Sequence, residues 1–367
     1  MKNPKLLMML LSIFVMLTCF VACQNESNTS NDNIMPTEKV EATDTPTPTG
    51  IAPTNIITPS TAPTNTPTPT ESSSFDPEQV PKHIVIDNII YEYSEEENGM
   101  VVTGKNKSNL GDVTLQREIS GCPVVKIGYK AFEWSRIKSI IIPDSVTKIG
   151  GYAFQYCSEL TSVTLPDSIT EIGMYAFCMC ENLIDITLPY GITIIEQGTF
   201  EGCTKLSSIN IPESVTDICF NAFAGCISLT SITIPDSVTC LSDSAFPHCS
   251  GLTEIIIPND ITDLGTSAFK GCTSLTKILL PDKLIVLRHW SFKDCISLTE
   301  ITIPNEVIAI NQEAFKNCPN LTTVIIPDSV TSIDDTAFVD SPNVVIHTTS
   351  QYVIDYAKSH GIKYVTE

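Results

Sequence analysis

The sequence is poor in basic residues. Its 367 residues include 21 Lys and Arg against 42 Asp and Glu, which gives a formal charge of −21. Nucleic-acid binding requires clustered Lys and Arg side chains that neutralise phosphates. The composition therefore argues against a nucleic-acid partner.

Motifs of known catalytic chemistry are also lacking. The five His do not lie in a metalloprotease motif, and no nucleophile elbow or phosphate-binding loop is present. Acidic residues recur at one position of a repeating unit, namely Asp144, Asp167, Asp236 and Asp328. Repetition at one position indicates turn formation rather than catalysis, and a calcium site there would lack any recognised loop. We therefore predict a protein that is not an enzyme, with no catalytic residue, metal or cofactor.

Long hydrophobic runs are absent except for one near the N-terminus. Residues 6–21 are almost entirely apolar and follow Lys2 and Lys5, the layout of a secretory signal. The run is shorter than the about 20 residues that cross a bilayer. It ends in the letters FVAC, which resemble a bacterial lipoprotein box whose Cys takes up lipid. We therefore predict a signal peptide over residues 1–22 and lipidation at Cys23; the alternative is cleavage nearby and release as a secreted protein.

The segment that follows has little that could form a core. Residues 23–80 are rich in Thr, Pro, Asn and Ser, with runs such as TPTPT at 45–49 and 66–70. Such composition favours extended, polyproline-like conformations over packing. We expect a disordered stalk between the anchor and a folded domain.

The rest of the chain is an array with a period of 23 residues. Three residue types recur in register over about 200 residues, which leaves almost no room for chance. Phe recurs at 132, 154, 177, 200, 223, 246, 269, 292, 315 and 338; Pro at 143, 166, 189, 212, 235, 258, 281, 304 and 327; Cys at 157, 180, 203, 226, 249, 272, 295 and 318.

Each repeat combines a short strand with a turn and a second buried segment. Between Leu229 and Ile234 apolar residues alternate with polar ones, which indicates a strand with one buried face. Pro235 ends that strand because proline donates no ladder hydrogen bond. A unit this small cannot hold a core alone, so the repeats must stack into a solenoid.

The shared unit, C-x-x-L-x-x-I-x-I-P-x-x-V-x-x-I-x-x-x-A-F-x-x, resembles the treponemal-type leucine-rich repeat of BspA-like bacterial surface proteins. The resemblance covers about residues 84–367. It implies a leucine-rich-repeat solenoid of the α/β type, with a curved parallel β-sheet of about nine to ten repeats and caps at both ends. We assign the N-terminal cap to residues 81–128, the array to 129–345 and a helical C-terminal cap to 346–367.

The cysteines favour structure over chemistry. Eight lie on one register, so each is expected beside its equivalents as a small buried thiol; these are Cys157, Cys180, Cys203, Cys226, Cys249, Cys272, Cys295 and Cys318. No unit offers a His at ligand spacing, which disfavours a metal array. Parallel Cβ vectors on neighbouring turns suit disulfides poorly. The four remaining cysteines of the folded part, Cys122, Cys178, Cys219 and Cys240, have no predicted role.

Binding is expected on the outward face of the strands. The third and fifth residues of the pattern L-x-x-I-x-I face outward and are mostly Ser and Thr. The exception is an apolar pair with charged neighbours, formed by Ile256 and Leu279 with Glu254, Lys277 and Glu300. An apolar pair within a charged rim is typical of a binding patch. The alternative is an ordinary exposed sheet surface.

These predictions describe a stalked solenoid, anchored by lipid and displayed outside the cell. The family resemblance implies adhesion to a protein of a host or neighbouring cell, with membrane contact through the lipid anchor only. Two alternatives remain: a passive spacer of the envelope, or an accessory glycan-binding module. The glycan alternative calls for exposed aromatic residues, and the predicted sheet face contains none.

Overall fold

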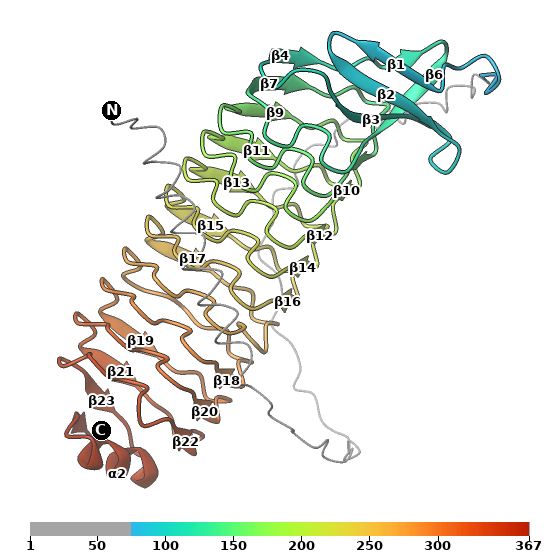
Figure 1. Cartoon of the computed structure of the whole chain (residues 1–367). Helices are drawn as coiled ribbons and strands as arrows, with labels where there is room; N and C mark the ends of the chain where they lie inside the picture. Colours follow the sequence, from blue (N-terminus) through green and yellow to red (C-terminus); the bar gives the residue numbers. More distant parts are fainter. Residues whose placement is uncertain (1–74, 367) are drawn as a thin grey trace, which may run out of the picture. The chain divides into compact units, whose positions relative to one another are not determined.

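The computed structural model describes residues 75–366. The predicted signal peptide, Cys23 and the stalk up to residue 74 lie outside the described residues. The described part is a parallel β-solenoid of about 11 turns of about 23 residues each (Figure 1). The predicted leucine-rich-repeat solenoid is confirmed.

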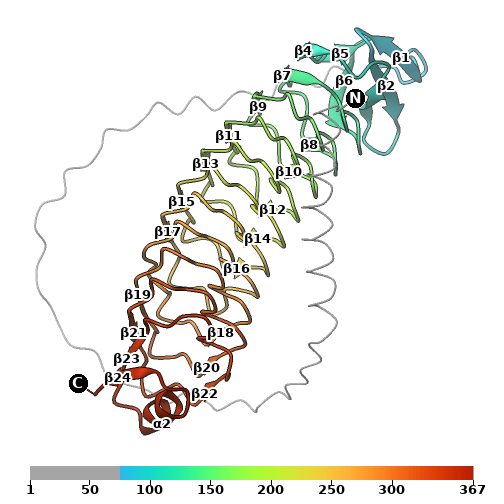
Figure 2. The same cartoon turned by 60° about the vertical axis from the view of Figure 1, so that its left-hand side comes forward.

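A first column of strands, the outer-sheet column, runs along the solenoid with parallel pairing between turns (Figure 2). Its strands are β4 (Gly111–Thr114), β7 (Ile137–Ile141), β9 (Ser162–Thr164), β11 (Asp185–Thr187), β13 (Ser208–Asn210), β15 (Ser231–Thr233), β17 (Glu254–Ile256), β19 (Glu300–Thr302), β21 (Thr323–Ile325) and β23 (Val345–His347). In β15 the central Ile232 is buried between exposed Ser231 and Thr233, as the alternation in the sequence predicts.

A second column of mostly two-residue strands follows the turn in each repeat. Its strands are β6 (Cys122–Ile127), β8 (Lys148–Ile149), β10 (Glu171–Ile172), β12 (Ile194–Ile195), β14 (Asp217–Ile218), β16 (Cys240–Leu241), β18 (Val286–Leu287), β20 (Ala309–Ile310) and β22 (Ser332–Ile333). In both columns the regular ladder is divided into short segments, although the β9 and β11 turns are still joined by a hydrogen bond from the Ile184 amide to the Thr161 carbonyl at 3.3 Å. Strands this short, ended by proline in the outer column, form only a few hydrogen bonds with each neighbour.

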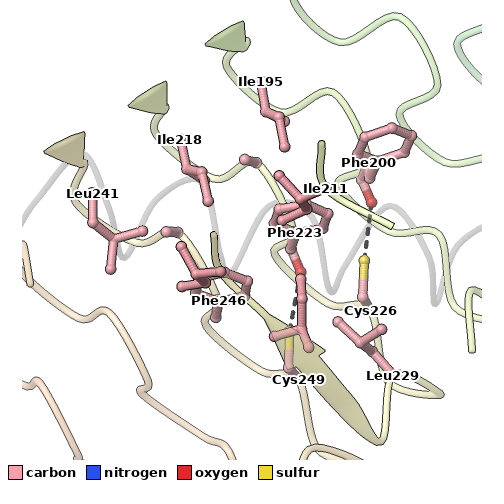
Figure 3. Packing of buried hydrophobic residues seen from close by; sticks show 14 of the residues in the cluster. Ile195, Phe200, Ile211, Ile218, Phe223, Cys226, Leu229, Leu241, Phe246 and Cys249 are labelled. Carbon is pink, nitrogen blue, oxygen red and sulfur yellow. Dashed lines mark hydrogen bonds between the residues drawn. The ribbon is translucent and has the colours of Figure 1, made fainter. Parts of the chain in front are cut away.

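The core is a spine of phenylalanine rings. The ten Phe of the array are buried, and each stacks on the next with ring centroids 5.2 to 5.9 Å apart. Figure 3 shows Phe200, Phe223 and Phe246 with the aliphatic residues around them. The 23-residue period therefore places identical large side chains in contact, which gives the near-neighbour packing typical of repeat proteins.

Two turns adopt the left-handed conformation, one two residues after Phe in every repeat and one just before the Ala-Phe pair in every repeat but the last. In the second of these positions, the post-Phe column, the residues with positive φ are Trp134, Tyr156, Met179, Gly202, Gly225, His248, Gly271, Asp294, Asn317 and Asp340. In this conformation a residue with a Cβ is less stable by about 1–2 kcal/mol, and glycine does not have this cost because it lacks a Cβ. The repeat fixes the backbone at these turns, while the residue that occupies them varies widely.

The N-terminal cap is built on antiparallel strands. Its strands are β1 (His83–Ile86), β2 (Ile89–Ser94), β3 (Gly99–Lys105) and β5 (Glu118–Ile119). Strand β3 pairs in parallel with β6, while β4 pairs in parallel with β7. Both strand columns thus begin within residues 81–128, the range predicted as the cap.

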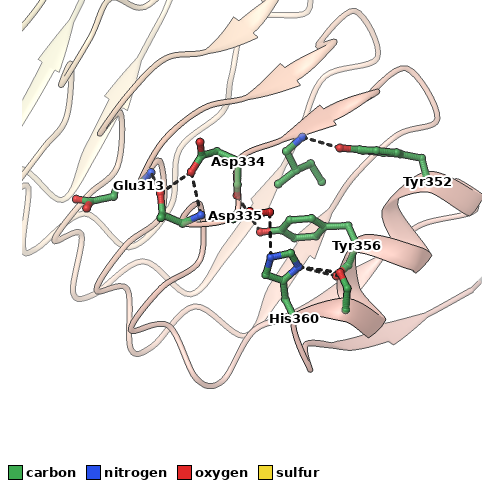
Figure 4. A network of polar contacts seen from close by, with 9 residues as sticks. Glu313, Asp334, Asp335, Tyr352, Tyr356 and His360 are labelled. Atoms are coloured by element: carbon green, nitrogen blue, oxygen red, sulfur yellow. Dashed lines mark hydrogen bonds and ion pairs between the residues drawn. The ribbon is translucent and has the colours of Figure 1, made fainter. Parts of the chain in front are cut away.

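The C-terminal cap combines a helix with a final strand. Helix α2 (Gln351–Ser359) begins after Ser350, and β24 (Lys363–Val365) pairs with β23. Two tyrosines fix the helix to the last turn (Figure 4): the Tyr352 hydroxyl accepts a hydrogen bond from the Ile333 amide, and the Tyr356 hydroxyl donates one to the Asp334 carbonyl. The cap covers the end of the Phe spine, where Phe338 meets Tyr356.

Candidate functional site: an apolar pair on the exposed sheet face

The five predicted site residues lie together on the outer-sheet column. Ile256 ends β17 and pairs with Leu279 of the next turn through an isolated parallel bridge. Their side chains are highly exposed, at 64% for Ile256 and 76% for Leu279. The structure thus brings the two apolar residues side by side on the surface, and we name this pair with its charged neighbours the sheet patch.

Charged residues border this pair. Lys277 Nζ lies 2.7 Å from Glu300 Oε1, and both side chains are well exposed. Glu254 lies at the start of β17, two residues before Ile256, and is also exposed. Exposed ion pairs add little stability, with a median of about 0–1 kcal/mol. The arrangement is therefore available for recognition because little of the fold depends on it.

The backbone is loosely paired at the sheet patch. The hydrogen bond from the Thr276 amide to the Thr253 carbonyl is 3.4 Å long, against 2.9 Å at the equivalent bond from Thr253 to Thr230. The strand ladder is interrupted between β17 and β19, where residues 277–280 form only the bridge. The ladder is also interrupted between β9 and β11 and between β13 and β15, so the interruption is not peculiar to the sheet patch.

Other apolar residues of the same column stand alone. Ile141 is 58% exposed on β7, and Ile325 is exposed on β21. Their partners across the parallel ladder are Thr114 and Thr164 for Ile141, and Thr302 and His347 for Ile325. Ile141 is therefore a matched control for the sheet patch, since it has similar exposure at the same position of the repeat without an apolar neighbour.

The sequence prediction missed two other groups of exposed apolar residues. Ile285 and Ile308 are exposed one turn apart beside the second strand column, at a position where most other turns carry Thr. Tyr129 and Trp134 are exposed on the turn that leads into and out of the first Ala-Phe pair. The period could have revealed the first group, because Ile285 and Ile308 replace the Thr of their register; the registers of Tyr129 and Trp134 have no common residue type.

The eight cysteines in register are buried with no exposed surface. Each Sγ contacts the Phe carbonyl 26 residues earlier at 3.1 to 3.3 Å, or 25 residues earlier for Cys157, as Figure 3 shows for Cys226 and Cys249. Burial raises the pKa of the Cys226 thiol well above its ordinary value, which keeps it protonated and unreactive. Each described cysteine is a free thiol.

The four cysteines outside this register have different environments. Cys122 and Cys178 are buried, Cys219 is half-buried and Cys240 is exposed. Within residues 75–366 no three His, Cys, Asp or Glu side chains are grouped so that they could hold a metal ion.

The family of the chain follows from its match to a known repeat family. The family described as BspA type leucine rich repeat region matches residues 125–250 and 216–345, together more than half of the chain, with six copies. The chain belongs to the BspA-type leucine-rich repeat family. Members of this family are generally extracellular surface proteins, and their solenoid fold is typically non-enzymatic.

Solved structures resemble the chain over most of their own lengths. A leucine rich cell surface protein from Faecalibacterium prausnitzii is 23% identical, covering 79% of this chain and 96% of that chain, with a TM-score of 0.39. The leucine rich repeat protein of T. pallidum is 31% identical over 53% of this chain and 91% of that chain, with a TM-score of 0.48. The pneumococcal vaccine antigen PcpA is 18% identical over 78% and 99%, with a TM-score of 0.49.

Two further findings complete these comparisons. No curated protein matched the chain. Among residues 75–366, the structure contains no helix with the length and apolar character needed to cross a membrane.

Proposed function

We propose that this protein is a surface adhesin that binds a protein ligand of a host or neighbouring cell through the sheet patch. The observation that carries the proposal is the adjacency of Ile256 and Leu279, both highly exposed, beside the Lys277–Glu300 ion pair. Interfaces commonly join an apolar centre to a polar rim. The surrounding Ser and Thr residues of the outer-sheet column supply a polar surface over which a larger interface can extend.

Display outside the cell is part of the same proposal. The lipid anchor at Cys23 and the Thr- and Pro-rich residues 24–80 would hold the solenoid away from the membrane. Metabolic labelling with a palmitate analogue should mark the wild-type chain and should fail in Cys23→Ala. Labelling that persists in Cys23→Ala would contradict anchoring at this residue, and a wild-type chain released unlabelled into the medium would favour secretion.

An array of extracellular matrix and cell-surface proteins, probed with the full chain, tests the binding function. We expect retention on at least one protein spot, lost when Ile256→Glu and Leu279→Glu are combined. Ile141→Glu is the control because it places a glutamate at the same repeat position, away from the sheet patch. Failure of the wild-type chain to bind any protein would favour the alternative, a passive spacer of the envelope.

A further inference from the structure

An aromatic cluster lies on the first turns of the array, away from the outer-sheet column. Trp134 and Tyr156 of the post-Phe column stack with ring centroids 3.8 Å apart and planes 10° apart. Tyr152 stacks on Tyr175 at 5.1 Å, and Tyr129 meets Tyr152 edge-on at 5.5 Å. The rings come from successive turns, so the solenoid itself brings them together.

The backbone does not require aromatic residues here. At the positions equivalent to Trp134 the later turns use Gly202, Gly225 and Gly271, and the last three turns use Asp or Asn. These are the residue types that tolerate the left-handed conformation best, whereas bulky residues rarely adopt it. Met179 and His248 adopt the same conformation at this position, so it is not special to the first two turns. Glycine at three equivalent positions indicates that the fold does not depend on the stacked Trp134–Tyr156 pair.

Two rings of the cluster are open to solvent. Trp134 is 55% exposed although Tyr156 covers one of its faces, so the exposed area belongs to the opposite face and the ring edges. Tyr129 is 64% exposed, because Tyr152 touches it only edge-on. A ligand can therefore stack on an indole face and a phenol face that belong to a single turn.

Two charged groups of the same turn, Lys130 and Glu133, are already paired with each other. Lys130 Nζ lies 3.1 Å from Glu133 Oε1, and 5.5 Å from the ring centroids of both Tyr129 and Tyr152. The protein's own ammonium group thus occupies the cation site of the tyrosine rings, which disfavours a cationic ligand. The ion pair is neutral overall, in a chain of charge −21 that would repel anionic polymers. The site therefore favours an uncharged ligand.

We propose that Tyr129, Lys130, Glu133 and Trp134 form a binding site for a neutral carbohydrate. One face of a pyranose ring presents C–H bonds that pack on an aromatic face, while its hydroxyl groups donate to a carboxylate and accept from an ammonium group. Trp134 and Tyr129 supply the first kind of contact, and Glu133 and Lys130 the second. Exposed aromatic faces with a carboxylate and an ammonium group nearby suit the ring faces and hydroxyl groups of a polysaccharide, so carbohydrate is the occupant that we propose. This site is independent of the sheet patch.

Affinity electrophoresis of the full chain through gels containing neutral polysaccharides tests the proposal. The probes are a β-glucan, a mannan, an arabinoxylan and dextran, with pectin as an acidic comparison. We expect retardation by at least one neutral polysaccharide, weakened at least tenfold in Trp134→Gly and in Tyr129→Ala. Trp134→Gly installs the residue that three other turns use at this position, so the variant should keep the wild-type circular dichroism spectrum.

Tryptophan fluorescence gives a second, local readout. The chain has two tryptophans, Trp134 and Trp290. In Trp290→Phe the polysaccharide that retards the protein should shift the remaining emission and protect it from iodide quenching. In Trp134→Phe the same polysaccharide should leave the emission of Trp290 unchanged.

Three results would overturn this proposal: no retardation by any of the four neutral polysaccharides, retardation that persists in Trp134→Gly, or preference for pectin over all neutral probes. Combined Ile256→Glu and Leu279→Glu should leave retardation unchanged, which separates this site from the sheet patch. Loss of retardation in that variant would place carbohydrate binding on the sheet patch and also contradict the proposal.

Discussion

Glu201 is a partly buried acid whose removal should change how stability depends on pH. It follows Phe200 in the repeat, and its charge acts on Tyr156, Tyr175 and Cys178. Burial raises the pKa of its carboxyl from 4.5 to about 7, opposed in part by a hydrogen bond from Asn221. The perturbation we choose is Glu201→Gln, because Gln155 already occupies the equivalent position two turns earlier.

The sign and size of the effect follow from the two pKa values. An unfolded chain loses this proton near pH 4.5, whereas the folded chain keeps it until about pH 7. Between these values the folded state binds more protons, so this group's contribution to stability falls as pH rises and is lost above pH 7. A shift of about 2.5 units corresponds to about 3 kcal/mol, and water access to the partly buried carboxyl lowers this to about 2 kcal/mol.

Urea unfolding of the wild type and Glu201→Gln at pH values from 4 to 8 measures the contribution of the Glu201 carboxyl to the free energy of unfolding. Taking the difference between the two proteins cancels the other acidic groups. We expect nearly equal free energies of unfolding at pH 4, with Glu201→Gln more stable by about 2 kcal/mol at pH 8. Glu213→Gln, at an exposed acid, should shift stability by less than about 0.5 kcal/mol throughout. A pH-independent difference between Glu201→Gln and the wild type would refute the reasoning.

Three other predictions concern the core. Phe223→Ala should cost about 3–5 kcal/mol in urea unfolding, and Phe338→Ala should cost less because that ring stacks on only one other Phe; equal costs would contradict the stacked spine. Cys226→Ser should lower the free energy of unfolding by less than about 1 kcal/mol, since Ser341 already donates from the equivalent position to the Phe315 carbonyl at 2.6 Å. Cys226→Ala should cost more, because it removes the donor to the Phe200 carbonyl. A serine variant less stable than the alanine variant would refute this reasoning. Iodoacetamide applied to the denatured protein without reductant should label all eight cysteines in register, and protection of most of them would reveal disulfides instead.

The solenoid could be predicted from the sequence because its main determinant is a period. Phe, Pro and Cys recurring every 23 residues force identical side chains into contact between turns, and the alternation around Ile232 identifies the buried face. The sheet patch follows from the same alternation, because Ile256 and Leu279 hold outward positions in neighbouring turns. A repeat pattern thus predicts both the core and the exposed columns.

Other features depend on contacts that the pattern does not contain. The left-handed turns were not predicted because glycine occupies their second position in only three turns, Gly202, Gly225 and Gly271, and residues of mixed type occupy it in the others. The aromatic cluster was missed for a different reason: aromatic residues were expected only at the outward positions of the strands. The burial of Glu201 depends on neighbours from two adjoining turns, and the interrupted ladder at Leu279 depends on bond lengths that no residue type reveals.

The most direct test of the central claim is the ratio of dissociation constants for a protein ligand found on the array. The comparison is between the wild type, the combined Ile256→Glu and Leu279→Glu variant, and Ile141→Glu, all as full chains. Central interface residues typically contribute 2 kcal/mol or more, about 30-fold in affinity, so the double variant should bind at least ~30-fold more weakly. Ile141→Glu should bind as the wild type does. Equal affinity of the double variant and the wild type would contradict binding through the sheet patch.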